Sequence, residues 1–567
     1  MIRAIFLFVM LSVINNVFGQ EVLLDIMEEE ITREMNGLQK AEIPPYYIDY
    51  RVNDVTDLNI SAAFGSLTQS EKERSRILTT NVKVGDYALD NSHEVNASGY
   101  GVYGHAFGAL NSILPLENDE MAIKQTLWRA TTSEFHSATE AYKNVKNNIE
   151  KEADGEKKVA DFSKEEPTVF VEPELPEISA LIDQEKWEKK VKSISTYFLK
   201  NPHLTSGAVS LAFSKERKYF ISTEGTKIAQ NMTYAYLNIS ASILAEDGDI
   251  LPLYKSYFAY LPADLPEEDV LVKDVALMIE KLEKLRNAPL AEPYSGPAIL
   301  DARSAGVFFH EIFGHRIEGH RLKSEMDGQT FLSKVNDPVL DKSLNVISDP
   351  TLTSYGGTDL IGNYKYDDEG VQAQRVTVVE RGVLTSFLMS RSPLENFPVS
   401  NGHGRASAGM KAVSRQSNLL IESNKPLSTA SLRKKLIKEC KKQNKEYGYL
   451  FSDVIGGFTT TDRFSANVFN VMPTEVYRIY VDGRPDELVR GVDLIGTPLA
   501  MFGEIKAAGE HKEIFTGICG AESGSVPVSA IAPALFVRRI ETQKKVKQNA
   551  QPSLLSRPSG SSPSFTK

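Results

Sequence analysis

The sequence predicts an α+β protein of two domains, a mixed α/β N-terminal domain and a mainly antiparallel-β C-terminal domain with a candidate metal-site helix at its start. The chain has 567 residues, more than one ordinary domain holds. A helical pattern up to Asn287 is followed by Pro289, Pro293 and Pro297, which interrupt it. Beyond residue 376, short strand-like runs are joined by turn residues, a pattern typical of hairpins. These features predict a helix-and-strand half followed by a β-rich half.

The expected segments are a signal peptide over 1–19, the N-terminal domain over 20–290, the C-terminal domain over 291–545 and a disordered tail over 546–567. Arg3 precedes an apolar run from Ala4 to Ile14, which is typical of an export signal and too short to span a membrane. The tail is rich in Ser and Pro. We therefore expect an exported protein, periplasmic or secreted, with no membrane insertion once the signal is removed.

The N-terminal domain is expected to alternate between helices and strands. Helices are predicted at 28–35, at 118–150, around Trp187 and at 269–287, the last with Asp269 as its N-cap. Strands are predicted at 46–52, 80–85, 218–222 and 233–239. The charged stretch 151–176 predicts a loop or linker. This half shows no chemical motif, and its scattered histidines are expected to be structural or exposed.

In the C-terminal domain, a short strand at 298–300 leads to Asp301, which can cap the helix that carries His310. Hairpins are predicted at 377–384 and 475–484. Between them, one apolar helix face is expected to bury Cys440 in the core. The only other cysteine is Cys519, so a single bridge between the two is possible but a disulfide framework is not.

Charge and composition limit the classes of partner. The formal net charge is −11, and the pI is near 5.5. An acidic chain of this kind argues against nucleic acid as a partner. Hydrophobic residues make up 41% of the chain and charged residues 25%, which is the balance of a globular protein.

The strongest chemical signal is Phe309-His310-Glu311-Ile312-Phe313-Gly314-His315. Neutral imidazole is a common metal ligand, and Glu311 beside His310 can act as general base on a metal-bound water. Histidines at i and i+5 diverge by about 140° around a regular helix. Either the helix widens into a π-bulge, or it stops near Gly314 and His315 comes from the turn. Gly314 is expected to supply backbone freedom for either solution. The alternative is that both histidines are ordinary helix residues.

A catalytic zinc takes three protein ligands and leaves one position open, so a third ligand is needed. The candidates are Glu318, His320, His403, His511 and Cys519. Glu318 and His320 are close in sequence to His315. Cys519 is distant, but glycines surround it and a thiolate binds zinc strongly. It could equally be a small buried hydrophobe, and the residues alone leave the choice open.

The ordered set of motifs in the second half resembles the TldD/PmbA family of metallopeptidases, specifically its TldD-type, metal-bearing members. The matching segments are His310 to His315 with Glu318-Gly319, Asp367-Asp368-Glu369-Gly370, Gly382-Val383-Leu384, Val492 to Gly496, Cys519-Gly520, Ser525 to Val528 and Pro533. The likeness runs from about Gly296 to Val537. Asn401 to Arg405 matches the family's glycine-rich run only in part, and the N-terminal half shows little match.

This resemblance implies zinc (Zn²⁺) held by His310, His315 and Cys519, with Glu311 as general base. It implies a zinc-dependent peptidase that hydrolyses peptides or unfolded segments and forms a homo-dimer, or a hetero-dimer with a related subunit. Two other hypotheses are a non-catalytic exported binding or scaffold protein with a structural metal, which Glu318 or His320 would complete, and a subunit active only in a hetero-dimer. His403, Arg405 or a tyrosine are candidate oxyanion donors.

Overall fold

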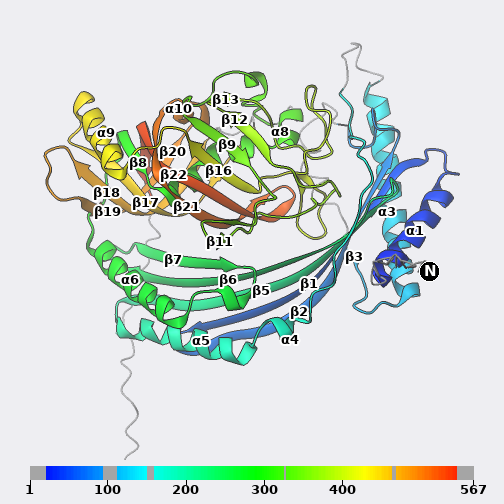
Figure 1. The fold of residues 1–567 in the computed structure, drawn as a ribbon, viewed down its shortest axis with the longest axis horizontal. Helices are drawn as coiled ribbons and strands as arrows, with labels where there is room; N and C mark the ends of the chain where they lie inside the picture. The colour runs from blue at the N-terminus through cyan, green and yellow to red at the C-terminus, as the bar shows by residue number, and fades with distance from the viewer. Residues whose placement is uncertain (1–20, 94–111, 150–158, 325–326, 463–467, 546–567) are drawn as a thin grey trace, which may run out of the picture.

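The fold is known here from a computed structural model, which describes residues 21–93, 112–149, 159–324, 327–462 and 468–545. The expected signal peptide and C-terminal tail lie outside these residues. Figure 1 shows one long, curved sheet built by the N-terminal half and a second, β-rich body built by the C-terminal half, which lies over the concave face of the first. The predicted α+β class is confirmed.

The N-terminal sheet has seven described strands in the order β3-β2-β1-β5-β6-β4, with β7 paired to β6. Their bounds are β1 Pro45–Ala63, β2 Ser66–Val84, β3 Ser112–Ile113, β4 Val169–Val171, β5 Leu204–Ser222, β6 Lys227–Leu244 and β7 Ile250–Ala259. Successive side chains of a strand point to opposite faces. On β1, Ile48, Tyr50 and Val52 belong to a core formed with helices, whereas Arg51 reaches residues of the C-terminal half. One face of this sheet therefore packs against helices, and the other contacts the C-terminal half.

Helices cover one face of the sheet. The described ones are α1 Val22–Leu38, α3 Glu120–Ile149, α4 Ile178–Leu181, α5 Gln184–Thr196 and α6 Glu268–Asn287. Helices α1 and α3 lie at one end of the strands, and α4 to α6 lie along the outer face of the other end (Figure 1). Helix α6 ends at Asn287 as predicted, but Glu267 occupies its N-cap position. The prediction of Asp269 as the cap is wrong, because the helix begins two residues earlier and Asp269 lies in its first turn.

The described part of the predicted linker is attached to both halves. Within it, β4 pairs in parallel with β6. Ser163 N donates to the carbonyl of Arg391, and the Arg391 guanidinium donates back to the carbonyl of Ser163. Arg391 also forms an ion pair with Glu224 at 2.7 Å. This segment therefore fastens the C-terminal half to the first sheet.

The C-terminal sheet has eleven described strands, in the order β13-β12-β9-β16-β22-β20-β18-β17-β8, with β19 paired to β18 and β21 to β22. The bounds of its longer strands are β8 Ser295–Leu300, β16 Asn418–Ser423, β17 Tyr447–Thr459, β18 Phe469–Tyr480, β20 Val492–Gly496, β21 Ile505–Ala521 and β22 Gly524–Lys544, and the shorter ones are β9 Leu344–Ser348, β12 Val376–Glu380, β13 Val383–Leu384 and β19 Glu487–Val489. Because β8 pairs with both β17 and β22, five strands close into a ring. The predicted hairpins are present as β12–β13 and β18–β19.

Helix α7, Ala302–Ile312, begins at its predicted N-cap, where the Asp301 carboxylate accepts from the N–H of Ala302 at 3.0 Å. It packs into the core of this half, with Phe308 against Phe469 and Phe309 against Phe502. Helix α9, Thr429–Lys442, buries Cys440 as predicted. Both cysteines are free thiols, so the Cys440–Cys519 bridge does not form. Among the described residues, no helix is both long and apolar enough to cross a bilayer.

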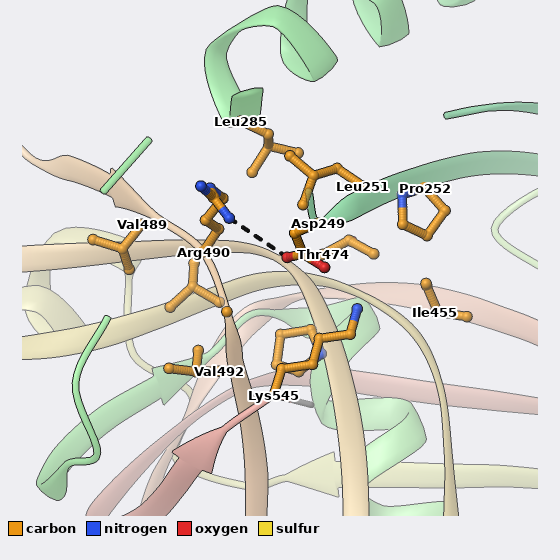
Figure 2. A pocket seen from close by; sticks show the side chains of 13 residues that line it. Asp249, Leu251, Pro252, Leu285, Ile455, Thr474, Val489, Arg490, Val492 and Lys545 are labelled. Carbon is orange, nitrogen blue, oxygen red and sulfur yellow. Dashed lines mark hydrogen bonds and ion pairs between the residues drawn. The ribbon is translucent and has the colours of Figure 1, made fainter. Parts of the chain in front are cut away.

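Ion pairs and apolar side chains both join the two halves. Arg490 of the C-terminal half forms ion pairs with Asp247 at 3.0 Å and Asp249 at 3.5 Å. Figure 2 shows the Arg490–Asp249 contact beside a small cavity lined by Leu251 and Leu285 on one side and Val492 on the other. Its lining contains none of the candidate metal ligands.

Candidate metal centre

The i and i+5 histidines are brought together by a change of helix type. Helix α7 ends at Ile312, and a 3-10 turn, Gly314–Arg316, follows it. Of the two solutions expected from the spacing, the structure takes the second, in which His315 comes from the turn. Gly314 has no left-handed φ; instead, a Cβ atom there would lie 1.8 Å from Gln416 Oε1. The glycine is therefore needed for space against a neighbouring side chain, which sequence spacing could not show.

His310, His315 and Cys519 each offer one potential ligand atom, and these atoms all lie within 4.8 Å of one another. They form the one such cluster of three or more found in the described part of the chain. Cys519 Sγ is 3.4 Å from His315 Nε2. Tetrahedral zinc with Zn–S of about 2.3 Å and Zn–N of about 2.0–2.1 Å places sulfur and nitrogen roughly 3.5 Å apart. The spacing and the N₂S donor set therefore fit zinc.

His315 is oriented by Glu318. The Nδ1 atom of His315 is 3.2 Å from Glu318 Oε2. A carboxylate accepts only, so this contact places a proton on Nδ1 and leaves Nε2 as the ring nitrogen that faces Cys519. Glu318 is fully buried. Burial alone would raise its pKa, but His315 and Arg321 hold that pKa well below the usual range, so the orienting group stays ionised.

The electrostatics of the cluster favour a thiolate. Cys519 is 5% exposed, and burial would raise its pKa. The adjacent His315 and His310 rings outweigh burial and hold the pKa of Cys519 well below its ordinary value. Burial opposes protonation of His315, but Cys519 and Glu318 raise the pKa of His315 to about 10. The thiolate is the metal-binding form of cysteine, so the hairpin supplies its ligand ready ionised.

Glu311 lies beside the cluster and is 6% exposed. Burial raises its pKa, which the two histidines partly offset. A Cβ atom at Gly457 of β17 would lie 2.7 Å from Glu311 Cγ, so this glycine leaves room for the carboxylate. The Arg316 guanidinium donates to the carbonyl of Glu311 at 2.8 Å and to that of Thr460 at 3.0 Å. The end of α7 is thereby tied to the β17–β18 hairpin.

The other candidate ligands lie elsewhere or have other partners. Glu318 Oε2 contacts His315 and Arg321, and His320 pairs through Nε2 with Glu522. The side chain of His320 is only 16% exposed. His511 is on the surface. His403 is fully buried between Asn401 and Ser348, and burial lowers its pKa to about 4.

Sequence reasoning missed the residues that hold Cys519 in place. The Arg415 guanidinium donates to the carbonyl of Cys519 at 2.7 Å, to Cys519 Sγ at 3.2 Å and to Ser523 Oγ at 2.8 Å. At the hairpin tip, Glu522 Oε2 accepts a hydrogen bond from Arg321 Nη2 at 2.6 Å. A fully buried arginine needs compensation, but neither spacing nor periodicity marks Arg415 in Ser414-Arg415-Gln416.

Comparisons with known proteins relate the second half of the chain to metallopeptidases. Residues 293–544 match the model of the PmbA/TldA metallopeptidase C-terminal domain. A "Metalloprotease" of Archaeoglobus fulgidus is 33% identical over 264 residues, covering 46% of this chain and 56% of that protein. The chain thus spans somewhat more than half the length of this relative. A "Zinc metalloprotease TldD homolog" of Saccharolobus solfataricus is 23% identical, covering 63% of this chain and 76% of that protein.

Solved structures extend the likeness to the N-terminal half. TldE from Thermococcus kodakarensis is similar with a TM-score of 0.59 at 14% identity, covering 91% of this chain and 100% of that one. A Thermotoga maritima protein titled a putative modulator of a DNA gyrase has a TM-score of 0.58 at 16% identity, covering 91% and 99%. At this identity the likeness concerns the fold alone. The domain match and the related metalloproteases place residues 293–544 in the TldD/PmbA family.

Proposed function

We propose that this protein is a zinc-dependent peptidase that hydrolyses peptides or unfolded segments, with His310, His315 and Cys519 as metal ligands and Glu311 as general base. The observation that carries the proposal is a set of three converging ligands beside a buried glutamate. Among the described residues, the two side chains that could have closed the set, Glu318 and His320, are engaged by other partners. Three ligands with one open position are typical of catalytic zinc, whereas structural sites are closed by four.

The roles of the protein groups follow from their positions. Bound zinc would supply a Lewis acid that polarises the scissile carbonyl and activates water. Glu311, whose pKa is raised by burial, would take a proton from the attacking water and pass it to the leaving amine as the C–N bond breaks. Glu318 would hold the His315 ring with Nε2 toward the metal. The names of the relatives as metalloproteases support this reaction class.

Among the candidate oxyanion donors, His403 and Arg405 lose support. Arg405 donates to the carbonyls of Gln416 at 2.6 Å and Pro527 at 2.9 Å and is 4% exposed. His403 is fully buried. A group that already has buried protein partners is poorly placed to meet a substrate. We therefore assign neither residue to substrate binding.

The central test is the Glu311→Gln variant, measured for zinc content and for cleavage of an unstructured peptide mixture. Zinc should stay near one per chain while cleavage falls by about 10²–10⁴-fold, the usual range for a general base. Glu513→Gln changes a half-exposed glutamate of the same strand as Cys519 and should cleave as the unmodified protein does. Undiminished cleavage by Glu311→Gln would remove this residue from the mechanism. Bound zinc without any cleavage by the unmodified protein would favour the scaffold alternative with a structural metal.

We also propose that the active form is a dimer, of two copies or with a related subunit, as the family resemblance implies. Light scattering on the purified protein would measure its mass. Activity that emerges only on mixing with a related subunit would identify the hetero-dimer, and full activity of a monomer would contradict both forms.

Export is proposed from the N-terminal pattern of Arg3 and the apolar run that follows. Expression of the full chain, followed by fractionation and sequencing of the mature N-terminus, tests it. We expect a new N-terminus near Gln20 in the exported fraction. An intact Met1 in the cytoplasmic fraction would contradict this expectation.

A further inference from the structure

The Arg415 guanidinium is the group that connects the thiol to the rest of the metal centre. It donates to Cys519 Sγ at 3.2 Å and lies with Nε 3.5 Å from Glu318 Oε1. Glu318 in turn contacts His315 Nδ1. One planar cation therefore touches a candidate ligand directly and reaches a second candidate ligand through its orienting carboxylate.

The setting of Arg415 makes its charge effective. Its side chain and that of Glu318 are both fully buried, so the interaction is only weakly screened. Its other bonds go to the carbonyls of Cys519 and Gly524 and to Ser523 Oγ. These contacts fix the tip of the β21–β22 hairpin, and they would be enough to explain a structural arginine.

The hydrogen bond from Arg415 to Cys519 Sγ is not needed for a purely structural role of the arginine. A hydrogen bond from a cation to a thiolate withdraws electron density from the sulfur, and hydrogen bonds to ligating sulfurs tune metal centres in general. Less donation from the sulfur leaves a bound metal ion more positive. The sulfur that accepts this contact also lies within 4.8 Å of the candidate ligand nitrogens of the two histidines.

We propose that Arg415 is a positioning residue of the metal centre, which holds Cys519 Sγ toward His310 and His315 and weakens electron donation from that sulfur to the bound metal. This inference rests on the proposed metal ligands. It makes the site a zinc–thiolate centre whose Lewis acidity is raised by a buried cation, and it assigns that effect to one named side chain.

The test uses the full chain loaded with cobalt(II), which replaces zinc and gives a sulfur-to-cobalt charge-transfer absorption band. Arg415→Lys keeps a positive charge but loses the planar fork, and Arg415→Met loses the charge. Removal of the hydrogen bond makes the sulfur more electron-rich, so the band should move to lower energy, furthest for Arg415→Met. In the zinc-loaded protein, kcat for peptide cleavage should fall while KM changes little.

Arg405→Met is the matched control, because Arg405 is also a buried arginine. Its guanidinium donates to the carbonyls of Gln416 and Pro527, whereas that of Arg415 also donates to sulfur. Arg405→Met should lower thermal stability and leave the cobalt band in place. If Arg415→Met does not fold, Arg415→Lys and the control decide the question. An unmoved band in Arg415→Lys, or an equal shift in Arg405→Met, would overturn the inference. Loss of the band in the unmodified protein or its retention in Cys519→Ala would instead overturn the proposed ligand set.

Discussion

The metal centre is assembled from two regions that differ in how the chain specifies them. The helix side, α7 with the following 3-10 turn, places His310, Glu311 and His315 within six consecutive residues. The hairpin side, β21 and β22, brings Cys519 from 204 residues beyond His315. Covalent spacing keeps the residues of the first group close together. The second depends on Arg415, Arg321 and Glu522, which attach the hairpin tip to the helix side. The two histidine ligands can therefore be recognised from a short sequence motif, whereas the cysteine ligand cannot be identified from its neighbours in the sequence.

The largest effect is expected from removing a ligand of the hairpin side. Cys519→Ala should abolish stoichiometric zinc binding, a loss greater than the roughly 10–100-fold that removal of an outer-sphere partner causes. Cys440→Ala is the control, since Cys440 is the other buried free thiol and lies on the buried face of α9. Zinc per chain is measured after gel filtration. Equal zinc retention in the two variants would contradict the assignment of Cys519 as a ligand, because the hairpin side would then contribute no ligand.

A smaller effect is expected from disturbing the orientation of His315 on the helix side. Glu318→Gln should weaken zinc binding by about 10–100-fold, because the buried carboxylate no longer holds Nδ1–H. Asp54→Asn is the control, because Asp54 is a buried carboxylate that pairs with Arg76 on the N-terminal sheet. Competition with a chelator gives the affinity of each variant. The hypothesis fails if Asp54→Asn weakens zinc binding as much as Glu318→Gln.

The protonation state of Cys519 in the metal-free protein tests whether the histidines of the helix side favour the thiolate on the hairpin side. Burial would raise the pKa of Cys519, but His315 and His310 hold it below its ordinary value. The thiolate should therefore persist as the pH falls below the usual thiol range of about 8.5 and be lost only on further acidification. Ultraviolet thiolate absorbance, with the signal of Cys519→Ala subtracted, follows this titration.

In His315→Ala, the midpoint of this titration should move up by on the order of one pH unit, because a neighbouring opposite charge typically shifts a pKa by 1–3 units. Cys440→Ala should leave the signal unchanged, because burial raises the pKa of Cys440 to about 11. An unmoved midpoint in His315→Ala would mean that the two sides are electrostatically independent.

The smallest effect concerns the join between helix and turn. Gly314→Ala would press a Cβ atom against Gln416, and overpacking of this kind costs about 1–3 kcal/mol. At about 2–4 °C per kcal/mol for a domain of this size, the melting temperature should fall by several degrees. Gly456→Ala adds the same methyl group to β17 where nothing lies within 4 Å, and it should change little. Gln416→Ala should restore part of the loss in Gly314→Ala; no restoration would assign the role of Gly314 to backbone conformation instead.

Elements with strong local patterns were predictable from the sequence. Helix α6, the Asp301 cap of α7, the apolar face of α9 and the two hairpins of the C-terminal half are all present. Each depends on residues within one or two turns of each other. Two features were not predicted: Glu267, and not Asp269, is the N-cap of α6, and β4 pairs with β6. The angle at which a chain enters a helix and a strand of three residues both leave almost no local pattern in the sequence.

The sequence by itself determined that two imidazoles and a carboxylate lie close together, because covalent spacing limits how far apart residues 310, 311 and 315 can be. It also determined the pair of competing solutions for the i and i+5 spacing, since helix geometry allows few others. Tertiary structure alone decided between them: α7 ends at Ile312 and a 3-10 turn follows it, with the Gln416 side chain in the space beside Gly314. It alone brought Cys519 to His315 and Arg415 to both Cys519 and Glu318. Such contacts depend on the pairing of distant strands, and no local pattern in the chain encodes that pairing by itself.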